Sequence, residues 1–146
     1  MKKPIVLISS ISILIVILDQ LTKFFVSKYM SLGQSIPLIK NILNFTYILN
    51  TGGGFGILKG WNVVLIFISL IIIGIILFYM DRIARDKQIH IPTALVLGGA
   101  VGNLIDRILL GHVIDFIDFR IWPAFNVADS CITIGAIWLI VYFWRK

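Results

Sequence analysis

The sequence predicts a membrane all-α protein: a bundle of four transmembrane helices with a small extracytoplasmic β-sheet between the first and second spans. Of the 146 residues, 59% are hydrophobic and only 14% are charged, and the mean hydropathy is +1.00. Four long apolar runs account for these averages, and a helix needs about 20 apolar residues to cross a hydrocarbon core. We therefore expect residues 1–146 to form a single integral membrane domain.

The first expected span begins like a secretory signal, because Met1-Lys2-Lys3-Pro4 precedes an apolar run. No small-residue cleavage site follows that run, so we expect it to remain as a span. Trp61 and Tyr79 flank the second run, as aromatic residues at a membrane interface do. The four expected spans cover about 5–28, 63–80, 92–110 and 126–144.

Two segments between the spans are predicted to lie outside the membrane. In the first, about 36–60, the stretch Leu43–Asn50 alternates apolar and polar residues, which predicts a strand with one apolar face. A glycine-rich turn over Thr51–Gly56 would let Ile57-Leu58 pair back onto it. The second segment, 111–125, is rich in aromatic residues, and we expect an irregular outer loop there.

The net charge of +6 comes from basic residues that mostly flank the spans, so it indicates membrane topology and contact with lipid, not nucleic-acid binding. With four spans, most of these residues fall on one side of the membrane. The positive-inside rule then places both termini in the cytoplasm. The residues concerned are Lys2, Lys3, Arg82, Arg85, Lys87, Arg145 and Lys146.

Three of the expected spans carry an aspartate at a similar depth. At ~1.5 Å rise per residue, Asp19 and Asp106 lie roughly 21 Å, and Asp129 roughly 22 Å, from the cytoplasmic ends of their spans. In the third span, Asn103, Asp106 and Arg107 stand at i, i+3 and i+4 and share one helix face. Ionisable groups at membrane depth are costly and indicate a functional site.

Composition excludes several kinds of site. Cys131 is the only cysteine, which rules out an intramolecular disulfide and a cysteine-based metal cluster. Two histidines and no glutamate leave no H-E-x-x-H motif, so a zinc protease is not expected. We expect neither a metal nor a cofactor.

Five motifs, in order along almost the whole chain, resemble those of the bacterial lipoprotein signal peptidases (signal peptidase II). They are Asp19-Gln20-x-Thr22-Lys23, Asn50-Thr51-Gly52-x-x-Phe55, Gly98-Gly99-Ala100-x-Gly102-Asn103-x-x-Asp106-Arg107, Val113-Ile114-Asp115-Phe116 and Phe125-Asn126-x-Ala128-Asp129-Ser130. The chain departs from the usual pattern at Gly53-Gly54, where alanines are more common.

The resemblance implies an intramembrane aspartyl endopeptidase of the bacterial cytoplasmic membrane. Such an enzyme removes the signal peptide of diacylglyceryl-modified prolipoproteins, cutting before the lipidated cysteine. Asp115 and Asp129 would be the catalytic pair, and we expect the protein to act as a monomer whose site lies near the outer face. The residues expected to shape the site or bind substrate are Asp19, Lys23, Asn50, Gly52, Asn103, Asp106, Arg107, Asn126 and Ala128.

Two neighbouring carboxylates suit peptide hydrolysis. Because like charges side by side do not easily both ionise, the pair shares one proton and so supplies both a base and an acid. Each residue also has a plainer interpretation. Asn126 could cap the fourth helix with Asp129 in its first turn. Asp106 and Arg107 could form a structural ion pair, together with Asp19 and Lys23.

Other parts of the sequence also have structural interpretations. Asp118 lies outside every motif, and we expect it to be a surface acid in a loop. The Gly98-x-x-x-Gly102 motif favours the close approach of two helices.

Two other functions also fit the buried acids. One is a small proton- or ion-coupled carrier that uses intramembrane carboxylates as a relay, and the other is a lipid-binding subunit without turnover.

Overall fold

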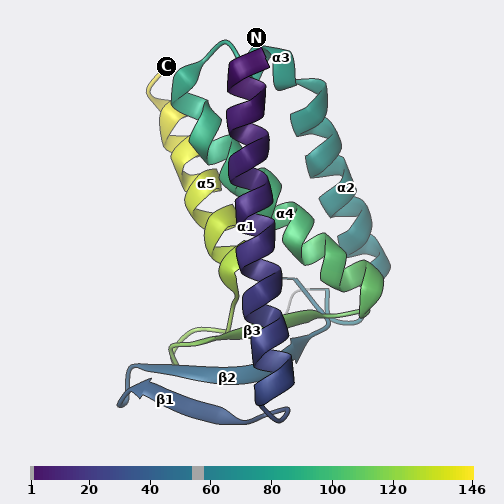
Figure 1. Ribbon diagram of the computed structural model, residues 1–146, viewed down its shortest axis with the longest axis vertical. Coiled ribbons are helices and arrows are strands. Elements are labelled where there is room, and N and C mark those ends of the chain that lie inside the picture. Colours follow the sequence, from purple (N-terminus) through teal and green to yellow (C-terminus); the bar gives the residue numbers. More distant parts are fainter. Residues whose placement is uncertain (1, 54–57) are drawn as a thin grey trace.

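The computed structural model describes residues 2–53 and 58–146. The helices gather into a bundle, and a small sheet closes one end of it, while both termini lie at the other end (Figure 1). The helices are α1 (Lys2–Tyr29), α2 (Asn62–Phe78), α3 (Met80–Ile83), the short 3-10 helix η2 (Lys87–Ile89), α4 (His90–Leu109) and α5 (Val127–Trp144). The strands are β1 (Ser35–Ile39), β2 (Leu43–Asn50) and β3 (Val113–Asp118).

Within the described residues, three segments are long and apolar enough to cross a membrane: α1, the segment from η2 through α4, and α5. The second predicted span, 63–80, corresponds to the apolar helix α2, which has 17 residues and is shorter than this length. The helical fold and three of the spans therefore follow the prediction. Large apolar side chains cover the outside of the bundle, for example Phe24, Phe67 and Ile140. Such a surface suits lipid rather than water.

Helix α4 is the centre of the bundle and packs against α1, α2 and α5. Its glycines allow this close packing, because a Cβ added to Gly98 would lie 2.8 Å from the backbone oxygen of Ser12 on α1. A Cβ at Gly99 would lie 2.5 Å from the backbone oxygen of Ala128 on α5. These approaches are closer than real Cβ atoms make. The prediction that the Gly98-x-x-x-Gly102 motif serves helix packing is confirmed at Gly98.

The sheet is antiparallel, in the order β1-β2-β3. The prediction of an irregular loop over 111–125 was wrong, because β3 lies within it and pairs with β2, placing Asp115 opposite Ile48. Both faces of β3 are covered at its start, where Val113 to Phe116 are all buried, so the segment lacks the alternation that marks a half-exposed strand. The sheet thus joins segments from both outer regions.

The expected return of Ile57-Leu58 onto the second strand falls partly on Gly54 to Ile57, which lie outside the described residues. Leu58 itself lies in a turn with φ 58° and is not part of a strand. The partner of β2 on that side is β3.

A small apolar cluster fixes the sheet against the end of α1. Val26 of α1, Ile114 and Phe116 of β3 are buried together, with Phe45 of β2 packed on them. The rings of Phe45 and Phe116 meet edge to face, with centroids 5.6 Å apart. Burial of these side chains holds β3, and with it Asp115, beneath the helix bundle.

Candidate active site

A set of polar and charged side chains is buried where α1, α4 and α5 meet β3. Their exposed fractions are 3% or less, which is rare for charged groups unless they are paired. The set consists of Asp19, Lys23, Asn103, Asp106, Asp115 and Asn126. Of the three acids predicted to lie at one depth, Asp19 and Asp106 belong to this set, and Asp129 contacts it through Asn103.

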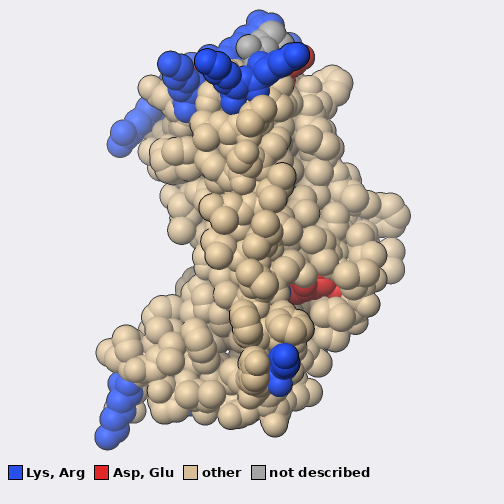
Figure 2. Space-filling view, in the orientation of Figure 1, with Lys and Arg blue, Asp and Glu red and all other residues tan. Residues whose placement is uncertain are grey.

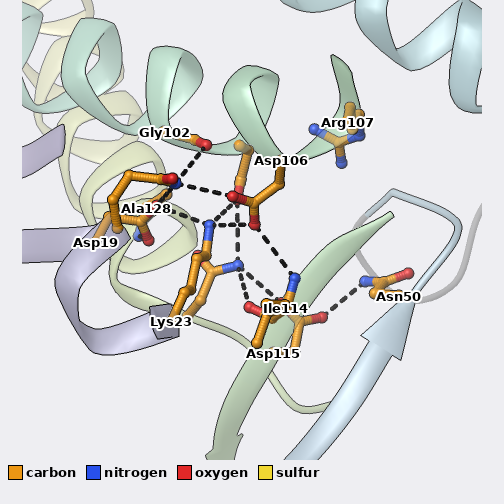
Figure 3. Close-up of polar contacts among 12 residues, drawn as sticks. Asp19, Lys23, Asn50, Gly102, Asp106, Arg107, Ile114, Asp115 and Ala128 are labelled. Carbon is orange, nitrogen blue, oxygen red and sulfur yellow. Dashed lines mark hydrogen bonds and ion pairs between the residues drawn. The ribbon is translucent and has the colours of Figure 1, made fainter. Parts of the chain in front are cut away.

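Lys23 is the positive centre of this set (Figure 3). Its Nζ lies 2.7 Å from Asp19 Oδ2 and 2.9 Å from Asp106 Oδ2, and it also donates a 3.1 Å hydrogen bond to Asn103 Oδ1. One ammonium therefore neutralises carboxylates from two helices. Gln20 completes the set by donating to Asp106 Oδ1 at 2.8 Å, a contact for which the sequence analysis assigned no role.

The same two carboxylates hold the backbone on either side of the site. Asp19 Oδ1 accepts a 2.9 Å hydrogen bond from the N–H of Ala128, and Asp106 Oδ2 accepts one of 3.3 Å from the N–H of Ile114. Ala128 directly precedes Asp129, and Ile114 directly precedes Asp115. The cluster of Asp19, Lys23 and Asp106 thus fixes the chain next to both candidate catalytic residues.

The predicted structural ion network is confirmed for Asp19 and Lys23 but was wrong for the Asp106–Arg107 pair. Asp106 pairs with Lys23, while Arg107 Nη2 donates to the backbone oxygen of Gly52 at 3.4 Å and forms no ion pair within the described chain. Adjacent residues on a helix point in different directions, so side chains at i and i+1 do not face each other. The partly buried guanidinium of Arg107 is therefore directed toward the end of β2.

Asp115 lies on β3 and is 1% exposed. Asn50 donates to its Oδ2 and Asn126 to its Oδ1, each at 2.8 Å. The orientation of the Asn50 amide is fixed because its oxygen accepts from the N–H of Gly52 at 2.9 Å. Burial, with the nearby negative charge of Asp129, raises the pKa of Asp115 to about 7.

Asp129 lies in the first turn of α5, and its Oδ1 accepts a 2.7 Å hydrogen bond from Asn103 Nδ2. The predicted cap is confirmed, since Asn126 Oδ1 accepts from the N–H of Asp129 at 2.8 Å. Asn126 therefore contacts both aspartates, through its amide nitrogen to the Asp115 side chain and through its oxygen to the Asp129 backbone. Capping and a site role are compatible at this residue.

A cavity of about 810 Å³ opens beside these groups. Its polar wall includes Asn50, Asn103, Arg107 and Asp129, whereas the buried Asp115 is not among the lining residues. The rest of the wall is mainly apolar and comes from α2, α4, α5 and the segment before α5, including Leu65, Ile68, Ile72, Val96, Trp122, Pro123, Phe125 and Ile132. The volume and the mainly apolar lining suit an apolar ligand that also carries a polar group.

Two further features concern acids and metals. Asp118 was expected at the surface of a loop, but it lies on β3, is partly buried and accepts a 2.7 Å hydrogen bond from Thr46 Oγ1 on β2. The prediction of a loop over 111–125 leaves no strand on which this cross-strand contact could form. In residues 2–53 and 58–146, no three histidine, cysteine or aspartate side chains are grouped so as to hold a metal ion.

The apolar helical bundle, with its buried polar site and adjoining cavity, defines a helical membrane protein. Two solved structures described as bacterial membrane enzymes share the fold. One, determined at 2.3 Å resolution, has a TM-score of 0.90 with 36% identity and covers 94% of this chain and 87% of its own. The other, at 1.9 Å, has a TM-score of 0.86 with 35% identity and covers 95% and 93%.

The family model of signal peptidase (SPase) II matches residues 11–145. The chain belongs to the signal peptidase II family and is a protease, which confirms the resemblance seen in the motifs. A lipoprotein signal peptidase of Halothermothrix orenii is 43% identical over 92% of each chain. That of Syntrophus aciditrophicus is 47% identical over all of this chain and 97% of its own.

Proposed function

We propose that this protein is an aspartyl endopeptidase that removes the signal peptide from diacylglyceryl-modified prolipoproteins by cutting before the lipidated cysteine. Membership in the signal peptidase II family supports lipoprotein precursors as the substrate. The observation that carries the mechanism is that Asn126 donates to the Asp115 carboxylate and accepts from the backbone N–H of Asp129, which joins the strand and the helix that carry the two acids. Asp129 also lines the cavity in which a substrate would lie.

The two aspartates divide the chemistry according to their surroundings. Asp129 faces the cavity and accepts the proton of a water molecule, whose oxygen then adds to the scissile carbonyl carbon. Asp115 is held protonated near neutral pH by its burial, so it donates to the developing oxyanion. As the C–N bond breaks, the leaving amine takes up the proton that Asp129 received, and Asp115 takes back a proton from a hydroxyl of the tetrahedral intermediate as the product carboxylic acid forms.

The remaining site residues position these two and the substrate. Asn50, Asn103 and Asn126 direct amide N–H groups at the carboxylates. The Lys23 cluster fixes the backbone at Ala128 and Ile114. Arg107, on the cavity wall beside Gly52, would bind a carbonyl or another electron-rich group of the substrate, and the apolar wall would contact the signal peptide and acyl chains.

The same proposal includes an orientation in the membrane. Lys and Arg atoms gather at the end of the bundle that carries both termini, and the middle of the molecule is almost free of charge on the face shown (Figure 2). This asymmetry supports four spans with both termini in the cytoplasm, the sheet outside, and the site near the outer face of the bacterial cytoplasmic membrane. The whole chain would act as one domain and as a monomer in contact with membrane lipid.

The substrate is tested by incubating the purified protein with a synthetic prolipoprotein peptide carrying a diacylglyceryl cysteine, alongside the same peptide without the lipid. The proposal expects mass spectrometry to find one cut, on the amino side of the cysteine, in the lipidated peptide only. Equal cleavage of both peptides, or a cut elsewhere, would contradict it.

A further inference from the structure

The end of the bundle opposite the site carries a second pocket, of about 700 Å³. It lies between the turn that links α2 to α4 and the last turn of α5. Four cationic side chains line it, and Asp86 is the only acid among the lining residues. The cations are Arg82, Arg85, Lys87 and Lys146. The proposed peptidase reaction makes no use of this pocket.

Most of this positive charge is not neutralised by the protein. Asp86 accepts from Lys146 Nζ at 3.2 Å and also from the Tyr142 hydroxyl. The Tyr142 hydrogen bond lowers the pKa of Asp86, so this carboxylate stays charged and engages Lys146. Within the described chain, Arg82, Arg85 and Lys87 form no ion pair with a carboxylate.

The turn that presents these cations is ordered by its own hydrogen bonds. Asp86 caps η2 by accepting from the N–H of Gln88 at 3.1 Å, and the buried ring of His90 contacts the backbone oxygen of Ala84 at 3.3 Å. The Asp86–Tyr142 bond ties this turn to α5. A general excess of basic residues on one side of a membrane requires no such built pocket, whereas recognition of a defined anion does.

The pocket also lies at the level expected for lipid headgroups. Phe78 ends α2 and Trp144 ends α5, with exposed fractions of 81% and 89%, as for aromatic residues at the membrane interface. Tyr79 and Phe143 extend this aromatic surface into the pocket wall. A ligand in the pocket could therefore place an anionic group among the cations and its acyl chains against the apolar flank of the bundle.

We propose that this pocket binds the phosphate group of an anionic phospholipid. Arg82, Arg85 and Lys87 contact the phosphate, since guanidinium and ammonium groups are its preferred partners in proteins. The site is separate from the proposed catalytic residues, so it stands whether or not the proposed peptidase mechanism is correct.

The test measures lipid binding to the purified, delipidated protein in an uncharged detergent, by the rise of its thermal unfolding midpoint on titration with phosphatidylglycerol. Phosphatidylcholine and inorganic phosphate serve as the other two ligands. The pocket variant is Arg82→Gln/Arg85→Gln/Lys87→Gln. Its matched control, Lys28→Gln/Lys40→Gln/Lys59→Gln, removes the same charge from exposed residues outside the pocket.

The wild type is expected to bind phosphatidylglycerol in preference to phosphatidylcholine. The pocket variant should bind phosphatidylglycerol about tenfold more weakly or worse, and the control variant nearly as well as the wild type. Equal weakening in both variants, or no preference for the anionic lipid, would overturn the proposal. So would binding of inorganic phosphate with the affinity of the lipid. If the triple variant unfolds early without lipid, Lys87→Gln alone replaces it in the comparison.

Discussion

At the scale of single residues, the proposed chemistry of the site depends on which of the two aspartates, Asp115 or Asp129, carries a proton. Asp115 has two amide donors, which favour its charged form, and yet burial and Asp129 outweigh them. A buried carboxyl that titrates near neutrality is suited to donate a proton to a carbonyl oxygen. Its partner Asp129 reaches the cavity, where water can enter. Different surroundings thus assign different roles to two chemically identical side chains.

The pH dependence of cleavage follows from this difference. Because the pKa of Asp115 is raised to about 7, the protonated form is lost as the pH rises through that value. We expect kcat to fall about tenfold per pH unit on the alkaline side, with the midpoint near pH 7. Folding stability should also decrease as the pH rises from about 4 toward 7, because the folded chain binds this proton more tightly than the unfolded chain does. A kcat that stays constant to pH 9 would contradict the assignment.

Variants of Asn126 can distinguish its capping of α5 from its positioning of Asp115. In Asn126→Ser the hydroxyl still caps α5, but no amide reaches Asp115. We expect a loss of about 100-fold in kcat, since small errors in position are costly in catalysis. Stability should fall as well, because the amide nitrogen also donates to Asn103 Oδ1 and to the backbone oxygen of Ile114. Asn126→Ala should lose the cap as well, at about 1 kcal/mol of unfolding free energy. Full activity in Asn126→Ser would show that the amide donor has no role.

At the scale of elements, helices and strands bring distant residues into contact through a single buried ion cluster. Lys23 on α1 compensates Asp106 on α4, and Asp19 and Asp106 in turn hold the starts of α5 and β3. Burying three charges is costly, and such a cluster stabilises the fold only while it is complete. Its value lies in fixing one arrangement of four elements.

Removal of the cation alone should therefore be more harmful than removal of all three charges. We expect Lys23→Met to lower the unfolding free energy by about 3–5 kcal/mol, because two buried carboxylates lose their counter-ion. The variant Asp19→Asn/Lys23→Met/Asp106→Asn should be less destabilised than Lys23→Met in the same denaturation assay. The opposite order would mean that the cluster does not act through charge.

Helix packing gives a second prediction at this scale. A Cβ at Gly102 would lie 2.7 Å from Asp19 Oδ2, so Gly102→Ala displaces a member of the ion cluster. We expect a loss of about 1–3 kcal/mol in stability, as for other overpacked positions. Gly74→Ala on α2 is the matched control, because no neighbouring atom lies within 4 Å of its Cβ position. The control should be neutral or slightly stabilising, and similar losses in both variants would refute the packing argument.

The limits of sequence reasoning also appear at the element scale. Apolar length alone located the helices to within a few residues, and the helical rise placed three aspartates at one level. Strand β3 was missed because its buried faces leave no alternation, and Asp118 was misplaced with it. Lys23 and Asp106 were predicted in one ion network, but Arg107, on the same helix as Asp106, was predicted as its direct partner, whereas the direct partner is Lys23 of α1. Pairing between elements is not encoded in local periodicity.

At the scale of the whole molecule, the candidate active site lies at one end of an apolar bundle, and Lys and Arg side chains gather most densely at the other end, with a few also at the sheet end (Figure 2). The sheet end holds the candidate active site and its cavity, and the end with the termini holds the basic pocket. Charge asymmetry of this kind orients a protein in the membrane and leaves the apolar flanks to lipid. The two pockets therefore address opposite faces of the membrane in the proposed orientation.

The most direct measurement of the central claim is cleavage of a diacylglyceryl prolipoprotein peptide by three single variants in which a carboxylate becomes an amide of the same shape. Asp115→Asn and Asp129→Asn should each lower kcat by about 10³-fold or more, since each removes one partner in proton transfer. Asp118→Asn is the control, because Asp118 lies on the same strand but contacts Thr46 and not the site. It should cleave at the wild-type rate. Wild-type cleavage by Asp115→Asn or Asp129→Asn, in protein with an unchanged unfolding midpoint, would contradict an aspartyl mechanism.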